Sequence, residues 1–298
     1  MADLILVSGF LGAGKTTLMK RLIDHYRAFR LHVIVNEFGR GTDGALLSVL
    51  GAAVTEIDNG SVFCACRAVD FERALRAAAQ DAEMILVEAS GLSDPVSIHT
   101  VTQAIPGIRY LGCVALADAT GVAKVLRTAR VSARQLSVAK VILLNKCDLV
   151  PCSESRETRR MLMERYPYAS VHRTINAVFS PPWLSRLAPG ESFPDQPHVR
   201  DIALQKARLD VKGTMTSDQL LAFIRQFAED TNRVKGFVTL KDGAFLVDCV
   251  GAYVQLVPQE GSVHGDNALN VLAGPGLPMR RSLKDAVGLF SEYVTEVR

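Results

Sequence analysis

Short apolar runs recur along the first two thirds of the chain, with amphipathic or polar stretches between them. A run in which nearly every residue is apolar predicts a strand that is buried on both faces, as in a parallel sheet covered by helices. The runs that we interpret as strands are Leu4–Ser8, His32–Asn36, Met84–Glu88, Gly112–Asp118, Val141–Asn145 and Ser170–Ile175. Their alternation with helical segments predicts an α/β domain, with a mostly parallel sheet flanked by helices.

The segment after the first predicted strand has helical periodicity. Between Gly14 and Phe29, apolar side chains recur at Leu18, Leu22 and Ile23, which places them on one face of a helix. The resulting order of strand, glycine-containing loop and helix is the order that a phosphate-binding site needs.

A change in composition divides the chain. Five prolines fall within residues 181–200, as is typical of a linker between domains. Beyond it, a βαβββα order is predicted by strands at Ala207–Val211, Val234–Leu240, Ala244–Cys249 and Ala252–Val257, and by helices at Ser217–Glu229 and from about Ser282. We therefore expect a first domain over residues 1–180, a linker over 181–200 and a small C-terminal α+β domain over 201–298.

Composition then narrows the class of protein. The chain has 298 residues, of which 48% are hydrophobic and 22% charged, with a formal net charge of +3. So mild a charge indicates no nucleic-acid or membrane surface, and no apolar run approaches the roughly 20 residues that span a bilayer. The six cysteines lack the spacing of a disulfide scaffold, and the first apolar stretch leads into a glycine loop instead of a cleavage site. We expect a soluble cytoplasmic protein with reduced thiols.

The loop after the first strand carries a phosphate-binding motif. Residues 9–16, GFLGAGKT, fit the pattern G-x-x-x-x-G-K-[ST] without a mismatch, which predicts a P-loop NTPase fold. In such a loop, backbone N–H groups converge on phosphate oxygens, the lysine reaches the β- and γ-phosphates, and the hydroxyl binds Mg²⁺. We therefore predict that Lys15 is catalytic and that Thr16 is a Mg²⁺ ligand. The residues expected to contact the nucleotide here are Gly9, Gly12, Ala13, Gly14, Lys15, Thr16 and Thr17.

The sequence Asn145-Lys146-Cys147-Asp148 ends another predicted strand and indicates which base is bound. The carboxylate of Asp148 can accept hydrogen bonds from N1–H and the 2-amino group of guanine, whereas adenine offers no such donor pair. At about 1.5–3 kcal/mol for each bond to a charged group, a tens-fold to thousands-fold preference for GTP over ATP is expected. Downstream, the backbone amide of Ala177 is a candidate donor to guanine O6.

Acidic residues after two strands are candidates for chemistry at the γ-phosphate. Glu88 ends a predicted strand, where a carboxylate can orient Mg²⁺ through water or orient the attacking water itself. Asp43, in the segment after Asn36, is a second candidate Mg²⁺ ligand. Arg40 and Arg67 are candidate arginine fingers, but nothing in the sequence selects one. Without a finger, hydrolysis is expected to be slow, at roughly 10⁻⁴ to 10⁻² per second.

These motifs occur in an order that is characteristic of one family. The chain carries, in sequence, GFLGAGKTT, VNEFG, NGSVFCAC, EASGLSDP and NKCDL, and it closely resembles the CobW-type GTPases, relatives of the nickel chaperones UreG and HypB and of the mutase chaperone MeaB. The resemblance covers about residues 3–177, and the RVKGFV segment with the strands after it is similar to the family's small appended domain. It implies a GTP/GDP-dependent protein that delivers a metal or a cobalamin-type corrinoid cofactor to a client enzyme, or activates that client.

The cysteine segment departs from the family's pattern. The usual metal motif follows an Asn-Gly pair as Cys-x-Cys-Cys, whereas here Ser-Val-Phe-Cys-Ala-Cys follows the pair and leaves Cys64 and Cys66. Two thiolates at this spacing can face one way on an extended segment, and their softness suits Zn²⁺, Cu⁺ or cobalt. Glu37 matches a carboxylate that helps to bind metal in some relatives. We predict a Zn²⁺ or Co²⁺ site at these three residues, with further ligands from a second subunit.

Other functions remain open on the sequence. Instead of binding metal, the cysteine pair could have a redox role, a client-docking role or a structural role. A metal-independent regulatory GTPase would need only the nucleotide-binding motifs and not the cysteine pair. A small-molecule kinase would use the same phosphate loop, but the guanine-specifying Asp148 disfavours it, and no acceptor pocket can be recognised. Relatives often pair around GTP, so a homodimer is expected, with a client metalloenzyme or corrinoid protein as partner.

Overall fold

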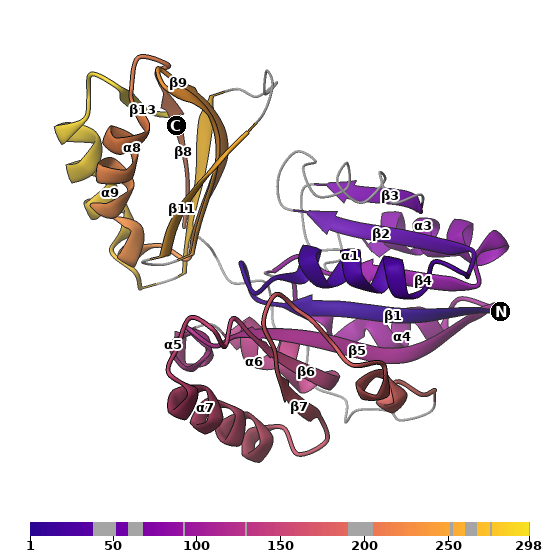
Figure 1. Ribbon diagram of the computed structural model, residues 1–298. Coiled ribbons are helices and arrows are strands. Elements are labelled where there is room, and N and C mark those ends of the chain that lie inside the picture. Colours follow the sequence, from indigo (N-terminus) through magenta and orange to yellow (C-terminus); the bar gives the residue numbers. More distant parts are fainter. Residues whose placement is uncertain are drawn as a thin grey trace. The chain divides into compact units, whose positions relative to one another are not determined.

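Two compact units make up the chain, Met1–Asp201 and Ile202–Arg298 (Figure 1). The computed structural model describes residues 1–37, 52–58, 68–91, 93–128, 130–189, 205–250, 253–259, 267–274 and 276–297. Each unit is described by itself. No helix among these residues is both long enough and apolar enough to cross a bilayer.

Strands of the first unit form a seven-stranded sheet in the order β3-β2-β4-β1-β5-β6-β7, in which all neighbours are parallel. They are β1 (Ala2–Gly9), β2 (Leu31–Glu37), β3 (Ala53–Asp58), β4 (Met84–Glu88), β5 (Ile108–Asp118), β6 (Ala139–Asn145) and β7 (Ser170–Arg173). Every residue of β4 and β6 is buried, which explains why their sequences are uninterrupted apolar runs. The prediction of a parallel sheet is therefore confirmed.

One strand of this sheet, β3, was not predicted from the sequence. β3 lies at the edge of the sheet, and its polar residues Thr55 and Glu56 interrupt the apolar ones, so it has no continuous apolar run to reveal it. It pairs with β2 in register, with Asn36 opposite Ile57 and Glu37 opposite Asp58. The sheet thus continues one strand beyond the predicted edge.

Helices cover both faces of the sheet. They are α1 (Lys15–His25), α3 (Ala68–Asp81), α4 (Ile98–Gln103), α5 (Val122–Thr128), α6 (Arg130–Ser137) and α7 (Cys152–Arg165), with 3₁₀ turns η1 (Pro95–Ser97) and η2 (Pro181–Arg186). Leu18 and Leu22 of α1 pack on one face, in a cluster with Ile5. Phe71 of α3 and Leu162 of α7 belong to the cluster on the opposite face. The apolar periodicity of this segment therefore corresponds to the buried face of α1.

The start of the proline-rich segment packs on the first unit. Leu184 in η2 and Leu187 just after it are buried in the same cluster as α1. The packed chain thus continues to at least Leu187, past the expected domain end at residue 180, because the apolar side chains between the prolines find a place in the core. Residues 190–204 lie outside the described part of the chain.

The second unit is a six-stranded antiparallel sheet in the order β11-β10-β9-β12-β8-β13, with α8 and α9 on one face (Figure 1). Its elements are β8 (Gln205–Val211), α8 (Ser217–Arg225), η3 (Ala228–Asp230), β9 (Arg233–Leu240), β10 (Gly243–Val250), β11 (Tyr253–Pro258), β12 (Ala268–Ala273), α9 (Met279–Leu289) and β13 (Val294–Val297). A capping box between Thr216 and Gln219 begins α8. Neither β12, which joins β8 to β9, nor the four-residue edge strand β13 was predicted.

A buried ion pair ties α6 to the segment after β4. The Nε of Arg134 lies 2.7 Å from Oδ2 of Asp94, and the two side chains are 11% and 0% exposed. The other oxygen of Asp94 accepts the backbone N–H of Val96 at 3.2 Å and so begins η1. Beside it, Gln135 donates to the carbonyl oxygens of Gly91 and Ser93 at 3.1 and 3.0 Å. One face of α6 therefore holds this loop in place.

Arg134→Met keeps the apolar length of the side chain and removes the guanidinium that pairs with the buried carboxylate of Asp94. We expect the free energy of unfolding to fall by about 3 kcal/mol, measured by urea denaturation near pH 7. Arg27→Met is the control, because Arg27 and its partner Asp24 are both largely exposed, and it should leave the midpoint unchanged. Equal midpoints for both variants would show that the buried pair contributes nothing.

Candidate functional site

The predicted phosphate loop connects β1 to α1. Gly9, Gly12 and Gly14 have φ angles of 136°, 73° and 104°, which side chains other than glycine rarely adopt. A Cβ at Gly9 would collide with the carbonyl oxygen of Leu116, and one at Gly14 would lie 2.6 Å from Nδ2 of Asn145. All three backbone angles therefore favour glycine, and the close approach of β5 and β6 also requires it at Gly9 and Gly14.

The loop ends where α1 begins. Gly14 is the N-cap residue and supplies no side-chain cap, and the first turn carries no acidic residue. The first N–H groups of this helix therefore donate no hydrogen bond to a cap side chain. No acidic side chain of that turn offsets the positive end of the helix dipole. Both features suit an anion site. Thr17 lies in this turn and is exposed.

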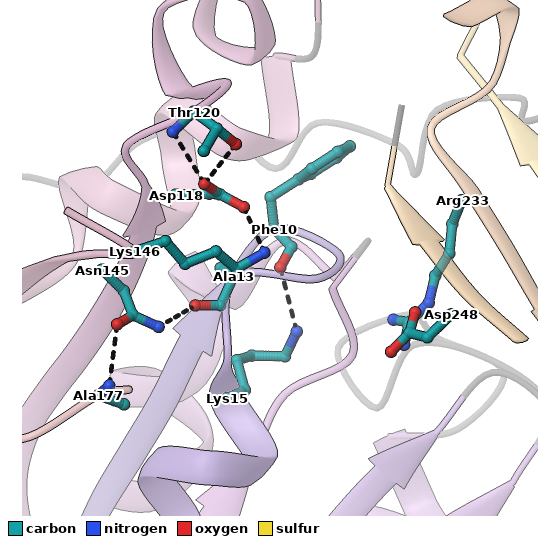
Figure 2. Close-up of polar contacts among 10 residues, drawn as sticks. All are labelled: Phe10, Ala13, Lys15, Asp118, Thr120, Asn145, Lys146, Ala177, Arg233 and Asp248. Carbon is teal, nitrogen blue, oxygen red and sulfur yellow. Dashed lines mark hydrogen bonds and ion pairs between the residues drawn. The ribbon is translucent and has the colours of Figure 1, made fainter. Parts of the chain in front are cut away.

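Side chains from the start of α1 and the end of β4 come together beside the loop. Lys15 is buried, and its Nζ donates to the carbonyl oxygen of Phe10 at 3.3 Å across the loop (Figure 2). The hydroxyl of Thr16 donates to Oε1 of Glu88 at 3.4 Å. Hydroxyl and carboxylate oxygens are ligands that Mg²⁺ prefers, so this pair fits that ion, bound directly or through water. The structure thus places Glu88 at the phosphate loop, as the strand-end argument predicted.

The side chain of Asn145 joins the two ends of the site. Its Nδ2 donates to the carbonyl oxygen of Ala13 at 2.9 Å, and its Oδ1 accepts the backbone N–H of Ala177 at 2.8 Å (Figure 2). Asn145 is only 3% exposed. Sequence reasoning assigned it to the nucleotide alone and missed that it holds the phosphate loop.

Ala177 differs from its predicted role. Its amide was expected to meet guanine O6, but it is buried and bonded to Asn145. The cause is local: Asn176 and Ala177 have φ angles of 51° and 52°, and this left-handed turn brings the N–H to the asparagine. In this conformation the N–H of Ala177 positions Asn145, and its contact with guanine O6 stays a prediction.

The next residues form the candidate base-binding segment. Nζ of Lys146 lies 2.7 Å from Oδ2 of Asp118. Oδ1 of Asp118 accepts the backbone N–H and the hydroxyl of Thr120 at 2.9 and 2.7 Å (Figure 2). Asp118 was not predicted as a site residue. The feature of the sequence that could have identified it is its place at the end of the strand next to β6. Asp148 is exposed, so its carboxylate is accessible to a ligand.

The candidate transition-metal ligands are largely outside what the structure describes. Both cysteines, Cys64 and Cys66, lie outside the described residues. So do the candidate Mg²⁺ ligand Asp43 and the candidate arginine fingers Arg40 and Arg67. Of Glu37, the backbone is described, at the end of β2. Within the described ranges, no three His, Cys, Asp or Glu side chains are arranged to hold a metal ion. The metal prediction therefore stays a prediction.

The other thiols have distinct environments. Burial raises the pKa of Cys113 well above its usual value and that of Cys249 to about 11, so both remain protonated and pack as small apolar residues. Cys152, exposed at the start of α7, accepts a hydrogen bond from Nη2 of Arg173 at 3.4 Å, and this bond lowers the pKa of the thiol.

Comparison with known proteins bears directly on this site. A sequence model of the CobW/HypB/UreG nucleotide-binding domain matches residues 3–172. The chain belongs to the CobW/HypB/UreG family. This match covers the phosphate loop, Glu88 and the base-binding segment, so the resemblance inferred from the motifs is confirmed. The family comprises P-loop GTPases.

Individual CobW/HypB/UreG relatives match shorter stretches. The chain is 42% identical over 102 residues to the zinc chaperone CobW of Pseudomonas aeruginosa, covering 30% of this chain and 27% of that one. It is 29% identical over 166 residues to the zinc chaperone YjiA of Escherichia coli, covering 52% of each. The chain thus spans about half, or less, of the length of these curated relatives. The crystal structure of Zn(II)-bound YjiA GTPase aligns with 97% of this chain and 98% of that one, at 18% identity and a TM-score of 0.47.

Lys15→Ala removes the cation at the phosphate loop. We expect the affinity for GTP to fall by roughly tenfold or more, because a hydrogen bond from a charged donor contributes about 1.5–3 kcal/mol. The measurement is a titration with a fluorescent GTP analogue in the presence of Mg²⁺. Lys20→Ala is the matched control, because Lys20 is an exposed lysine on the same helix. Wild-type affinity in Lys15→Ala would refute the assignment of the phosphate loop.

Asp148→Asn replaces the acceptor that would read guanine. We expect the ratio of GTP to ATP affinity to fall by roughly tens-fold, and affinity for xanthosine triphosphate to rise, because its 2-oxo group needs a donor. Competition against a labelled nucleotide measures the affinities for GTP, ATP and xanthosine triphosphate. Glu154→Gln, at an exposed acid in the first turn of α7, controls for the loss of charge. An unchanged GTP to ATP ratio would show that the base is read elsewhere.

Proposed function

We propose that this chain binds GTP, hydrolyses it slowly, and uses its nucleotide state to control the delivery of a transition-metal ion to a client metalloenzyme. The observation that carries the proposal is the contact of Thr16 with Glu88 beside the phosphate loop, in a chain of this family. Relatives that are named zinc chaperones favour Zn²⁺ as the cargo over a corrinoid cofactor.

The described residues divide the work on the nucleotide. The phosphate loop and the start of α1 bind the phosphates through backbone N–H groups, and Lys15 neutralises charge at the β- and γ-phosphates. Thr16 and Glu88 would hold Mg²⁺, which stabilises the charge that develops on the phosphates. Glu88 is only 5% exposed, so its carboxylate is shielded from bulk water, which supports a role in orienting a single attacking water. Asp148 selects guanine.

The cargo site is proposed to comprise Glu37, Cys64 and Cys66, with a second copy of the chain supplying further ligands. An unperturbed cysteine has a pKa of about 8.5, and only its thiolate binds metal. Each Zn²⁺ therefore displaces protons, and affinity is expected to rise with pH up to that value and then level off. Release to the client would follow from a change of these ligands when GTP is hydrolysed.

A Co²⁺ titration of the reduced protein tests the cargo site, because thiolate-to-Co²⁺ charge transfer gives an absorption band that bound oxygen ligands do not. We expect the band in the wild type, its loss in the Cys64→Ala, Cys66→Ala double variant, and a change of Co²⁺ affinity when a non-hydrolysable GTP analogue and Mg²⁺ are present. Competition with Zn²⁺ then ranks the two metals.

Cys152→Ala is the matched control for this titration, since it removes an exposed thiol outside the proposed cargo site and should leave the band intact. If the double variant retains the band, the cysteine pair is not the site. If the wild type binds GTP but gives no thiolate band, the chain is a metal-independent regulatory GTPase.

A further inference from the structure

Three segments of the first unit meet at one buried amide. Asn36, next to the end of β2, is 3% exposed. Its Nδ2 donates to the carbonyl oxygen of Ile57 in β3 at 3.1 Å. Its Oδ1 accepts the backbone N–H of Ser90 at 3.4 Å and the hydroxyl of Ser93 at 3.3 Å, both in the loop after β4. One side chain thus joins two strands to a loop.

These segments lead to the two parts of the proposed mechanism, the cargo ligands and the nucleotide. Glu37 follows Asn36 directly, and β3 runs in sequence into the segment that holds Cys64 and Cys66. Ser90 stands two residues after Glu88, whose carboxylate meets Thr16 at the phosphate loop. We infer that Asn36 is the positioning residue that couples the nucleotide at Glu88 to the cargo ligands after β2 and β3. The inference rests on the proposed function.

The chemistry of the amide suits this role. A primary amide donates and accepts at the same time, so it can hold a strand carbonyl on one side and a loop N–H and hydroxyl on the other. Asn36 and Ile57 are directly paired in the β2–β3 ladder, so the donor side is braced by the sheet. The two bonds on the acceptor side are near the upper limit for hydrogen bonds. A small shift of the loop therefore breaks or shortens them while the bond to β3 stays.

The loop that contacts Asn36 also packs on the phosphate loop. A Cβ added to Gly91 would lie 2.8 Å from the backbone nitrogen of Leu11 and 2.6 Å from its Cδ2. A movement of the phosphate loop is therefore transmitted to Gly91 by direct contact. Gln135 holds the carbonyl oxygens of Gly91 and Ser93, and Arg134 pairs with Asp94 just after them. Since these groups are anchored on α6, the groups left to respond are the N–H of Ser90 and the hydroxyl of Ser93, both of which face Asn36.

The test is the ratio of two Co²⁺ affinities, one measured with a non-hydrolysable GTP analogue and Mg²⁺, the other with GDP and Mg²⁺. For the wild type we expect a coupling factor within the usual range of about 5 to 150. Asn36→Ala should bring the factor to about 1, while the affinity for the GTP analogue changes by less than about threefold. A purely structural role would lower the unfolding midpoint without altering the ratio.

Two further variants keep the test decisive. Ser93→Ala removes one of the acceptor-side bonds and should give an intermediate factor, even if Asn36→Ala does not fold. Thr102→Ala is the control, because it removes a buried hydroxyl that bonds within α4 to Ile98, and it should retain the full factor.

The outcomes separate this inference from the proposed function. If the wild type has a coupling factor of 1, the proposed function fails and the inference fails with it. If the wild type is coupled and both Asn36→Ala and Ser93→Ala keep the wild-type factor, the proposed function stands and the role of Asn36 is overturned. If only Ser93→Ala can be purified, an unchanged factor in that variant overturns it as well.

Discussion

The nucleotide site depends on how closely the phosphate loop approaches the ends of β5 and β6. A side chain at Gly9 would occupy the position of the Leu116 carbonyl, and one at Gly14 would displace the amide of Asn145. Because glycine has no side chain, the loop can pass this close to β5 and β6. The amide of Asn145 then holds it at Ala13. The contacts of the loop with β5 and β6 thus position both the phosphate-binding part and the base-binding part of the site.

The order of strands explains how two functions share one sheet. β2 and β3 carry or lead to the proposed cargo ligands, whereas β1 leads to the phosphate loop, and β4 lies between β2 and β1. β4, which ends in Glu88, is therefore the strand that adjoins both sides, and the proposed coupling would pass through it. The loop after it touches Leu11 on one side and Asn36 on the other. Coupling across this sheet requires only adjacent contacts.

Much of this arrangement could be predicted from sequence, because it is local. Buried parallel strands produce apolar runs, and a phosphate loop needs glycines and a Lys-Thr pair at fixed spacing. The parallel sheet and the place of the loop between β1 and α1 could therefore be predicted. What was missed depends on tertiary contacts. β3 is an edge strand without a run, Asp118 is recognised only by its neighbour Lys146, and the amide of Ala177 is redirected by a left-handed turn that its own sequence does not reveal.

One further consequence follows from the anchoring of α6. This helix holds the loop after β4 through Gln135 and Arg134, and the chain then continues directly into β6, which ends at Asn145. The same helix therefore restrains the loop beside Glu88 and leads into the strand that carries Asn145. A displacement of α6 would shift the loop and the strand together, because both are tied to this one short helix.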